Sequence, residues 1–232
     1  MTKTGQCALF AASALLLGVS QAEAEIIGGV DFPQGQLSFA DSVVSFVPGA
    51  AGIPSAAYLG QSNALGAPNY NGNPSCASQA ACTFLSLGAG GALVLRFDDN
   101  VLTGSDDSDF DLWVFEVGPN VEDTTVDLSV DGLTWLSVGS VTGSTRGIDI
   151  DAFGFDATSA FRYVRLIDVV NEGGTGNGGS VGADIDALGA ISTRPFTPPD
   201  NGVPEPSTWA MMLLGFAGLG SALRRNRRLR PI

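Results

Sequence analysis

The chain has 232 residues, and 24 acidic residues against 11 lysines and arginines give it a formal net charge of −13. It contains no histidine. This composition excludes Ser-His-Asp and Cys-His catalysis, acid–base chemistry by imidazole, and histidine-ligated zinc. Residues 25–206 hold 5 arginines, no lysine and 23 acids, a balance of 5 − 23 = −18. We therefore expect no nucleic-acid binding, whereas divalent cations would be attracted.

The N-terminal residues 1–24 predict a secretory signal peptide. Lys3 precedes a short apolar run at residues 7–19, and Ala22-Glu23-Ala24 offers a small-x-small cleavage site. Cys7 begins the apolar run and would be removed with the signal. The alternative is a buried N-terminal helix.

Residues 25–191 are expected to form one all-β domain. Their apolar segments are short, and Gly, Asp and Asn turns separate them. Period-2 alternation is clear in residues 126–130 and 163–167, and no helical periodicity competes outside the two termini. We predict a β-sandwich of jelly-roll type with about eight strands, within residues 37–47, 83–87, 92–97, 110–117, 124–130, 135–141, 161–168 and 184–191.

Cys76 and Cys82 are the two cysteines that remain after removal of the signal. In an oxidising compartment such a close pair is expected to form a disulfide that closes a small loop. Two free thiols are the alternative. A reactive thiol has no support, since no histidine or lysine is available to lower its pKa.

Aspartates are concentrated between residues 98 and 111. On an extended chain, alternate residues point to one side, so Asp107, Asp109 and Asp111 would gather carboxylates that attract a cation. Calcium suits a site made only of oxygen ligands, although the spacing does not match an EF-hand. A solvated acidic loop is the alternative.

An internal repeat extends this prediction. Residues 147–154 and 182–189 share the pattern G-x-D-I-D-A-x-G, in which two acids would take one face of a strand and isoleucine the other. Glu116 shares its predicted strand face with apolar residues. Buried carboxylates need a bound ion or an arginine such as Arg162 or Arg165, although the repeat would also fit a turn-plus-strand pattern. The residues predicted to bind calcium are Asp107, Asp109, Asp111, Glu116, Asp184 and Asp186.

The Asp131-Gly132 turn before Trp135 predicts a β-hairpin. The pattern S-x-D-G-x-x-W at residues 129–135, with residues 162–166 (RYVRL) downstream, resembles the discoidin-like, galactose-binding jelly roll. Three further stretches resemble bacterial cell-surface proteins built on that fold: residues 86–91, 109–116 and 182–187. The resemblance covers about residues 38–191 and implies the fold, but it supplies no fixed sugar-binding residue.

The C-terminus carries a second apolar run. A Pro-rich linker at residues 192–203 precedes Pro204-Glu205-Pro206, and residues 207–223 predict a transmembrane helix near the minimum spanning length. Five arginines follow, Arg224, Arg225, Arg227, Arg228 and Arg230, and the positive-inside rule keeps them in the cytoplasm. The prolines fix φ and remove N–H donors, which keeps the motif extended.

This order of parts, over residues 204–230, resembles the PEP-CTERM sorting signal of Gram-negative bacteria. The resemblance implies processing by a membrane-embedded exosortase and delivery to the cell surface or an exopolysaccharide matrix. Before processing, the precursor would be anchored in the membrane by its C-terminal helix.

Three functions remain open. The first is a calcium-stabilised, non-enzymatic surface or matrix protein. The second is a calcium-dependent carbohydrate-binding module for exopolysaccharide, with Tyr58, Tyr70 or Trp113 stacking on sugar rings. The third, a glycoside hydrolase with paired carboxylates, lacks a motif for a general acid.

Overall fold

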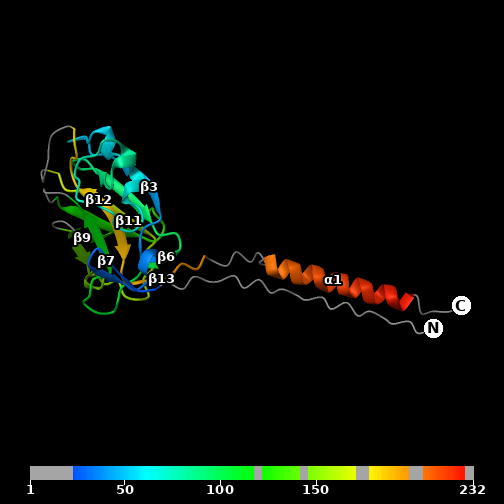
Figure 1. The fold of residues 1–232 in the computed structure, drawn as a ribbon. Coiled ribbons are helices and arrows are strands. Elements are labelled where there is room, and N and C mark those ends of the chain that lie inside the picture. Colours follow the sequence, from blue (N-terminus) through cyan, green and yellow to red (C-terminus); the bar gives the residue numbers. More distant parts are fainter. Residues whose placement is uncertain (1–22, 118–121, 142–145, 171–177, 199–205, 228–232) are drawn as a thin grey trace. The chain divides into compact units, whose positions relative to one another are not determined.

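The computed structural model describes residues 23–117, 122–141, 146–170, 178–198 and 206–227. The predicted signal peptide therefore lies almost entirely outside the described residues. The chain forms two compact units: the first ends at Phe196, and the second begins at Thr197. All the described strands belong to the first unit, and the helix α1 (Pro206–Arg227) belongs to the second (Figure 1).

The first unit is a sandwich of two antiparallel sheets, which confirms the predicted all-β fold. The five-stranded sheet has the order β3-β5-β11-β8-β9, with bounds Ser42–Val47, Ala92–Arg96, Tyr163–Asp168, Thr124–Ser129 and Leu136–Val141. The four-stranded sheet has the order β10-β7-β12-β4, with bounds Arg146–Ile148, Leu112–Glu116, Asp184–Ala190 and Leu85–Ser86. The predicted hairpin is confirmed, because β8 and β9 pair across the Asp131-Gly132 turn.

The main core fills the space between these two sheets. In β11, buried and half-buried positions alternate, so Val164 and Leu166 face inward while Arg165 faces outward. They meet Leu112 and Val114 of β7 and the apolar side chains of β12 in one cluster. The period of two along each strand thus fixes which residues are removed from water.

Strand β12 is buried on both faces, unlike β11. A register shift between Ile185 and Ala187 interrupts its alternation. Its outer face is covered by a second cluster that contains Phe32, Phe39 and Phe115. A Cβ on Gly189 would lie 2.6 Å from the Phe32 ring, so this close packing requires glycine.

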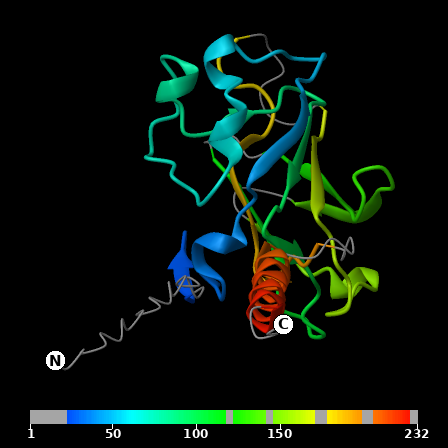
Figure 2. The same ribbon diagram turned by 90° about the vertical axis from the view of Figure 1, so that its right-hand side faces the viewer.

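Several short elements were not predicted. Some are strands of three residues, which are too brief to show a period: β1 (Glu25–Ile27), β2 (Val30–Phe32), β6 (Asn100–Leu102), β10 and β13 (Thr193–Pro195). The others are 3-10 turns: η1 (Gly35–Ser38), η2 (Ala56–Tyr58), η3 (Gln61–Ala64), η4 (Gln79–Ala81) and η5 (Asp151–Phe153). The turns η2 and η3, in cyan, lie at one end of the sandwich (Figure 2). The first unit also continues past residue 191, because β13 pairs with β6 inside the predicted linker.

The described part of the second unit contains one helix, α1, which includes the predicted transmembrane segment at residues 207–223. Its described side chains from Trp209 to Leu219 are exposed. Among the described residues, no helix has both the length and the apolar character needed to cross a membrane.

Candidate functional site

Three carboxylates meet where β7 begins and β10 ends. Asp111 directly precedes β7, Asp149 directly follows β10, and Asp151 opens η5. One oxygen of each lies within 4.8 Å of the others. The antiparallel pairing of Ile148 with Leu112 brings them together, and the Asp111 backbone N–H donates to the Ile148 carbonyl at 2.9 Å.

Each of these carboxylates is held by a backbone N–H through one oxygen. Ile150 donates to Asp111 Oδ2 at 2.9 Å, Ala152 donates to Asp149 Oδ1 at 3.2 Å, and Ser105 donates to Asp151 Oδ2 at 2.8 Å. The backbone thus fixes the orientation of all three carboxylates.

Asp111 is the most deeply buried member, with 0% of its surface exposed. Burial raises its pKa, the Asp151 charge adds to this, and the Ser192 and Ser105 hydroxyl groups and the Ile150 N–H oppose it. Its Oδ1 atom nevertheless accepts no hydrogen bond of ordinary geometry. A fully buried carboxylate oxygen without such a partner is costly unless a proton or a cation compensates it.

No arginine compensates the cluster within the described residues. The ion pairs there join Arg96 and Arg162 to Asp98, and Arg165 to Asp127. The arginines that the sequence suggested as partners for the aspartates of the repeat pair elsewhere: Arg165 Nη2 lies 2.6 Å from Asp127 Oδ2, and its guanidinium stacks on Trp135 at 4.5 Å.

The backbone also packs tightly against the cluster. A Cβ on Gly104 would lie 2.8 Å from both Asp151 carboxylate oxygens and 2.2 Å from the Phe155 carbonyl oxygen. Glycine at position 104 therefore lets the loop before β7 close over Asp151.

The structure separates the six predicted calcium ligands. Asp107 and Asp109 are exposed, and Asp107 Oδ1 accepts the Asp109 N–H at 2.8 Å. Among the described residues, neither they nor Glu116, Asp184 and Asp186 belong to a group of three acids with ligand atoms this close. Asp111 is the one predicted ligand in the cluster. Asp149 and Asp151 were visible in the sequence as members of the repeat, but the strand that aligns them with Asp111 was too short to detect.

Glu116 and Asp184 form a second acidic region at the other end of β7. Glu116 is 3% exposed and Asp184 is 6% exposed. Burial raises the pKa of Glu116 to about 9, and the Glu122 and Asp184 carboxylates add to this effect. Burial also raises the pKa of Asp184 to about 7, although the Ser86 hydroxyl, which donates to Asp184 Oδ1, opposes the shift. In the folded chain, these two carboxyl groups therefore keep their protons to a higher pH than ordinary carboxyl groups do.

Asp186 anchors a long loop instead. Its carboxylate accepts the N–H groups of Asn69 and Tyr70 at 3.0 to 3.1 Å. Burial raises its pKa, and these two N–H groups oppose the rise. Its partners lie 116 and 117 residues away in sequence, so no local pattern could have revealed this role.

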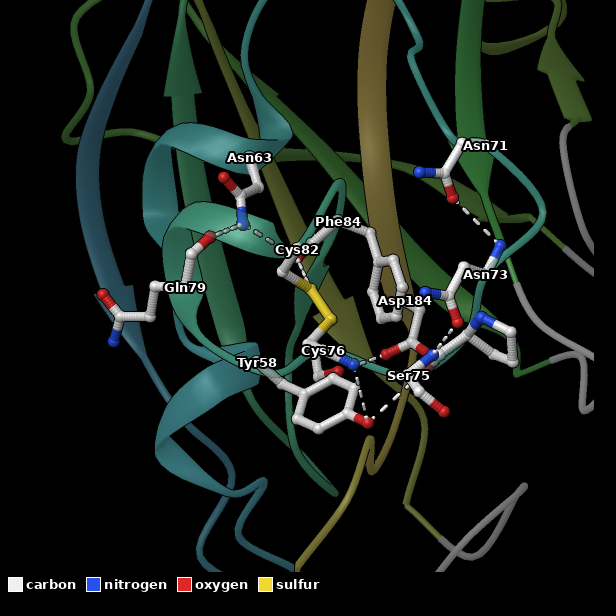
Figure 3. The surroundings of a disulfide bond; sticks show 12 residues. Tyr58, Asn63, Asn71, Asn73, Ser75, Cys76, Gln79, Cys82, Phe84 and Asp184 are labelled. Atoms are coloured by element: carbon white, nitrogen blue, oxygen red, sulfur yellow. Dashed lines mark hydrogen bonds between the residues drawn. A yellow bond between two sulfur atoms is a disulfide. The ribbon is translucent and has the colours of Figure 1, made fainter.

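The predicted disulfide between Cys76 and Cys82 is present (Figure 3). The Tyr58 hydroxyl group accepts the Cys76 N–H at 3.2 Å and donates to the Pro74 carbonyl at 3.4 Å. The Tyr58 and Tyr70 rings each pack 5.9 Å from the Phe84 ring. Both tyrosines that were predicted to stack on sugars thus take part in packing the disulfide loop.

The predicted sorting residues lie at the C-terminus. Pro206, Arg224, Arg225 and Arg227 belong to α1, and Arg224 is exposed. Pro204, Glu205 and Arg228 lie outside the described residues.

Solved structures similar to this chain share low sequence identity with it. The C-terminal domain of a chitobiase from Bacteroides fragilis is 15% identical, with a TM-score of 0.36, over 69% of this chain and 95% of its own. A chitosan-binding module from a Paenibacillus sp. IK-5 chitosanase/glucanase is 13% identical, with a TM-score of 0.36, over 70% and 98%. The Clostridium perfringens domain CpGH89CBM32-6 is 10% identical, with a TM-score of 0.34, over 67% and 94%. Similarity at this level carries no argument about a ligand for this chain.

No curated protein matches the chain. Residues 202–228 match the family described as the PEP-CTERM protein-sorting motif, in agreement with the resemblance in the sequence. The chain thus carries the PEP-CTERM sorting motif of an exported, surface-targeted protein.

Proposed function

We propose that this protein is a non-enzymatic cell-surface or matrix protein, exported and then processed by an exosortase at its C-terminal motif. The match of residues 202–228 to the PEP-CTERM sorting motif carries this proposal. The folded body supports it, since the strands and the core clusters lie in the unit that ends at Phe196, before the motif. Processing at the motif would leave this body intact.

The burial of the acids supports a role without catalysis. A carboxyl with a strongly raised pKa is a candidate general acid, and Glu116 and Asp184 have this property. Both, however, are at least 94% buried, so a polysaccharide could not reach them in this conformation. We assign their raised pKa values to packing inside the sandwich.

Replacement of the motif in the full chain tests the sorting proposal. The triple variant Pro204→Ala, Glu205→Ala, Pro206→Ala should accumulate as an unprocessed precursor in the host's membrane fraction, as measured by mass and by fractionation. Pro198→Ala, a proline replacement outside residues 202–228, is the matched control and should be processed normally. Normal processing and release of the triple variant would contradict the proposal.

A carbohydrate-binding module is the second candidate, and one surface aromatic pair favours it. Phe110 is 49% exposed and meets Trp113 edge to face at 5.5 Å between ring centroids. Its ring also packs on the backbone of Gly147, where an added Cβ would lie 2.3 Å from Cγ. A fixed, half-exposed ring of this kind could stack on a sugar.

Retention on the host's isolated exopolysaccharide tests this candidate, with and without calcium. Phe110→Ala should reduce retention of the protein, whereas Phe153→Ala, which removes a similarly exposed ring (47%), should not. Equal retention of both variants, or no retention of the unmodified protein, would remove the candidate for that polymer.

A further inference from the structure

We propose that Asp111, Asp149 and Asp151 form a calcium-binding site that joins the start of β7 to the end of β10. The site differs from the exposed aspartate-rich loop that the sequence suggested, and it does not depend on the sorting proposal. Its members are separated by up to 40 residues in the chain, and their ligand oxygens lie within 4.8 Å of one another.

Close approach of acids alone would not indicate a ligand, since exposed acidic groups often cluster. The independent observation is Asp111, which is fully buried and contributes an oxygen to the cluster, while its Oδ1 atom accepts no hydrogen bond of ordinary geometry. The Asp149 and Asp151 carboxylates, with oxygens within 4.8 Å of that of Asp111, make this burial less favourable still. A bound cation would compensate all three charges at once, whereas a proton on Asp111 would compensate only one.

The donor atoms select the class of cation. The cluster supplies only carboxylate oxygens, which suit a hard cation and disfavour metals that prefer nitrogen or sulfur. Asp149 and Asp151 are half-buried, so water could complete the coordination from their side. Calcium accepts irregular sets of six to eight oxygens, whereas magnesium demands near-octahedral geometry and loses its water reluctantly.

The backbone has already oriented the ligands. Each carboxylate accepts a backbone N–H group at one oxygen, which fixes the orientation of the side chain. Binding would therefore require little reordering of side chains. The ion would also fasten β10, a three-residue strand at the edge of its sheet, to the strand beside it.

The test is a titration of the sandwich unit, residues 25–196, with CaCl2 alone after chelator treatment. This fragment contains all the strands that the structure describes, with their core clusters, and it ends where the first compact unit ends. Calorimetry should find one calcium ion per chain within the range up to about 10 mM, since extracellular modules bind calcium at about 10⁻⁴–10⁻³ M. MgCl2 should bind at least about tenfold more weakly.

Isosteric variants locate the site. Asp149→Asn keeps an oxygen for the Ala152 N–H and should weaken calcium binding at least about tenfold, because a charged ligand is lost. Asp107→Asn removes an exposed acid of the neighbouring loop, and Asp31→Asn removes one from β2; both should bind calcium normally.

Melting temperatures separate a metal site from carboxylates that serve only as hydrogen-bond acceptors. In chelator, Asp149→Asn should melt above the unmodified unit, because it relieves repulsion among three carboxylates; in calcium the order should reverse. Absence of calcium binding by the unmodified unit would overturn the proposal. So would an equal loss of affinity in Asp107→Asn, preferential binding of magnesium, or a melting order that stays the same in both conditions.

Discussion

Replacement of Glu116 by glutamine should remove most of the pH dependence of stability between pH 7 and 8. Glu116 has a pKa of about 9 in the folded sandwich, against 4.5 for an ordinary glutamate. Over this range the folded chain retains a proton that the unfolded chain has lost. The stabilisation that this proton provides is therefore fully present below pH 4.5, and it is lost as the pH rises towards 9.

The magnitude follows from one proton. Each pH unit between the two pKa values costs about 1.4 kcal/mol, so Glu116 alone should lower the free energy of unfolding by about 3 kcal/mol from pH 6 to pH 8. Asp184, with a pKa of about 7, should add about 1 kcal/mol of loss, mainly below pH 7. In Glu116→Gln the loss between pH 7 and 8 should shrink to a few tenths of a kcal/mol.

Urea unfolding of residues 25–196 in chelator, followed by tryptophan fluorescence from pH 6 to 8.5, measures this slope. Histidine adds nothing to the background, because the chain contains none. A constant stability from pH 6 to 8 in the unmodified unit would refute the reasoning. The same slope in Glu116→Gln would refute the assignment to this residue.

Three further changes test contacts elsewhere in the sandwich. Arg165→Met should cost about 2–3 kcal/mol, because Asp127, which is 7% exposed, loses its ion pair; the double variant with Asp127→Asn should recover part of this loss in urea unfolding. Replacement of both Cys76 and Cys82 by serine should lower stability by about 2 kcal/mol, as expected for the small loop they close, and reducing agent should have no further effect on that variant. Gly104→Ala should lower both the melting temperature and the calcium affinity, since its Cβ would meet Asp151 and the Phe155 carbonyl; a variant that melts like the unmodified unit would contradict the close approach.

The sequence predicted strand β11 well because the burial of its side chains alternates. Strand β11 shows buried and half-buried positions in turn, as the pattern of residues 163–167 indicated. The repeat at residues 147–154 and 182–189 gave a less reliable guide. Its first copy leaves the strand after Ile148 and turns into η5, whereas its second copy continues as a strand buried on both faces.

The environment of each acid could not be predicted either, because the two copies of the repeat adopt different structures. Asp149 and Asp184 occupy matching positions in the repeat, yet Asp149 joins the carboxylate cluster and Asp184 is buried beside Ser86. The difference depends on which strand lies next to each copy, and sheet order is a long-range property. Composition, in contrast, needed no structure to exclude histidine chemistry.

The order of strands in both sheets constrains how this exported chain can fold. The strand β11 lies between β5 and β8, and β12 lies between β7 and β4, so each sheet receives an interior member from the last third of the sandwich sequence. Neighbouring hairpins such as β8 and β9 can pair early, but neither sheet closes until residues 163–190 have emerged. A chain that emerges from its N-terminus therefore stays without a complete core until nearly the whole domain has emerged. Because these pairings are long-range, loop closure must precede them, and the complete core forms late in folding.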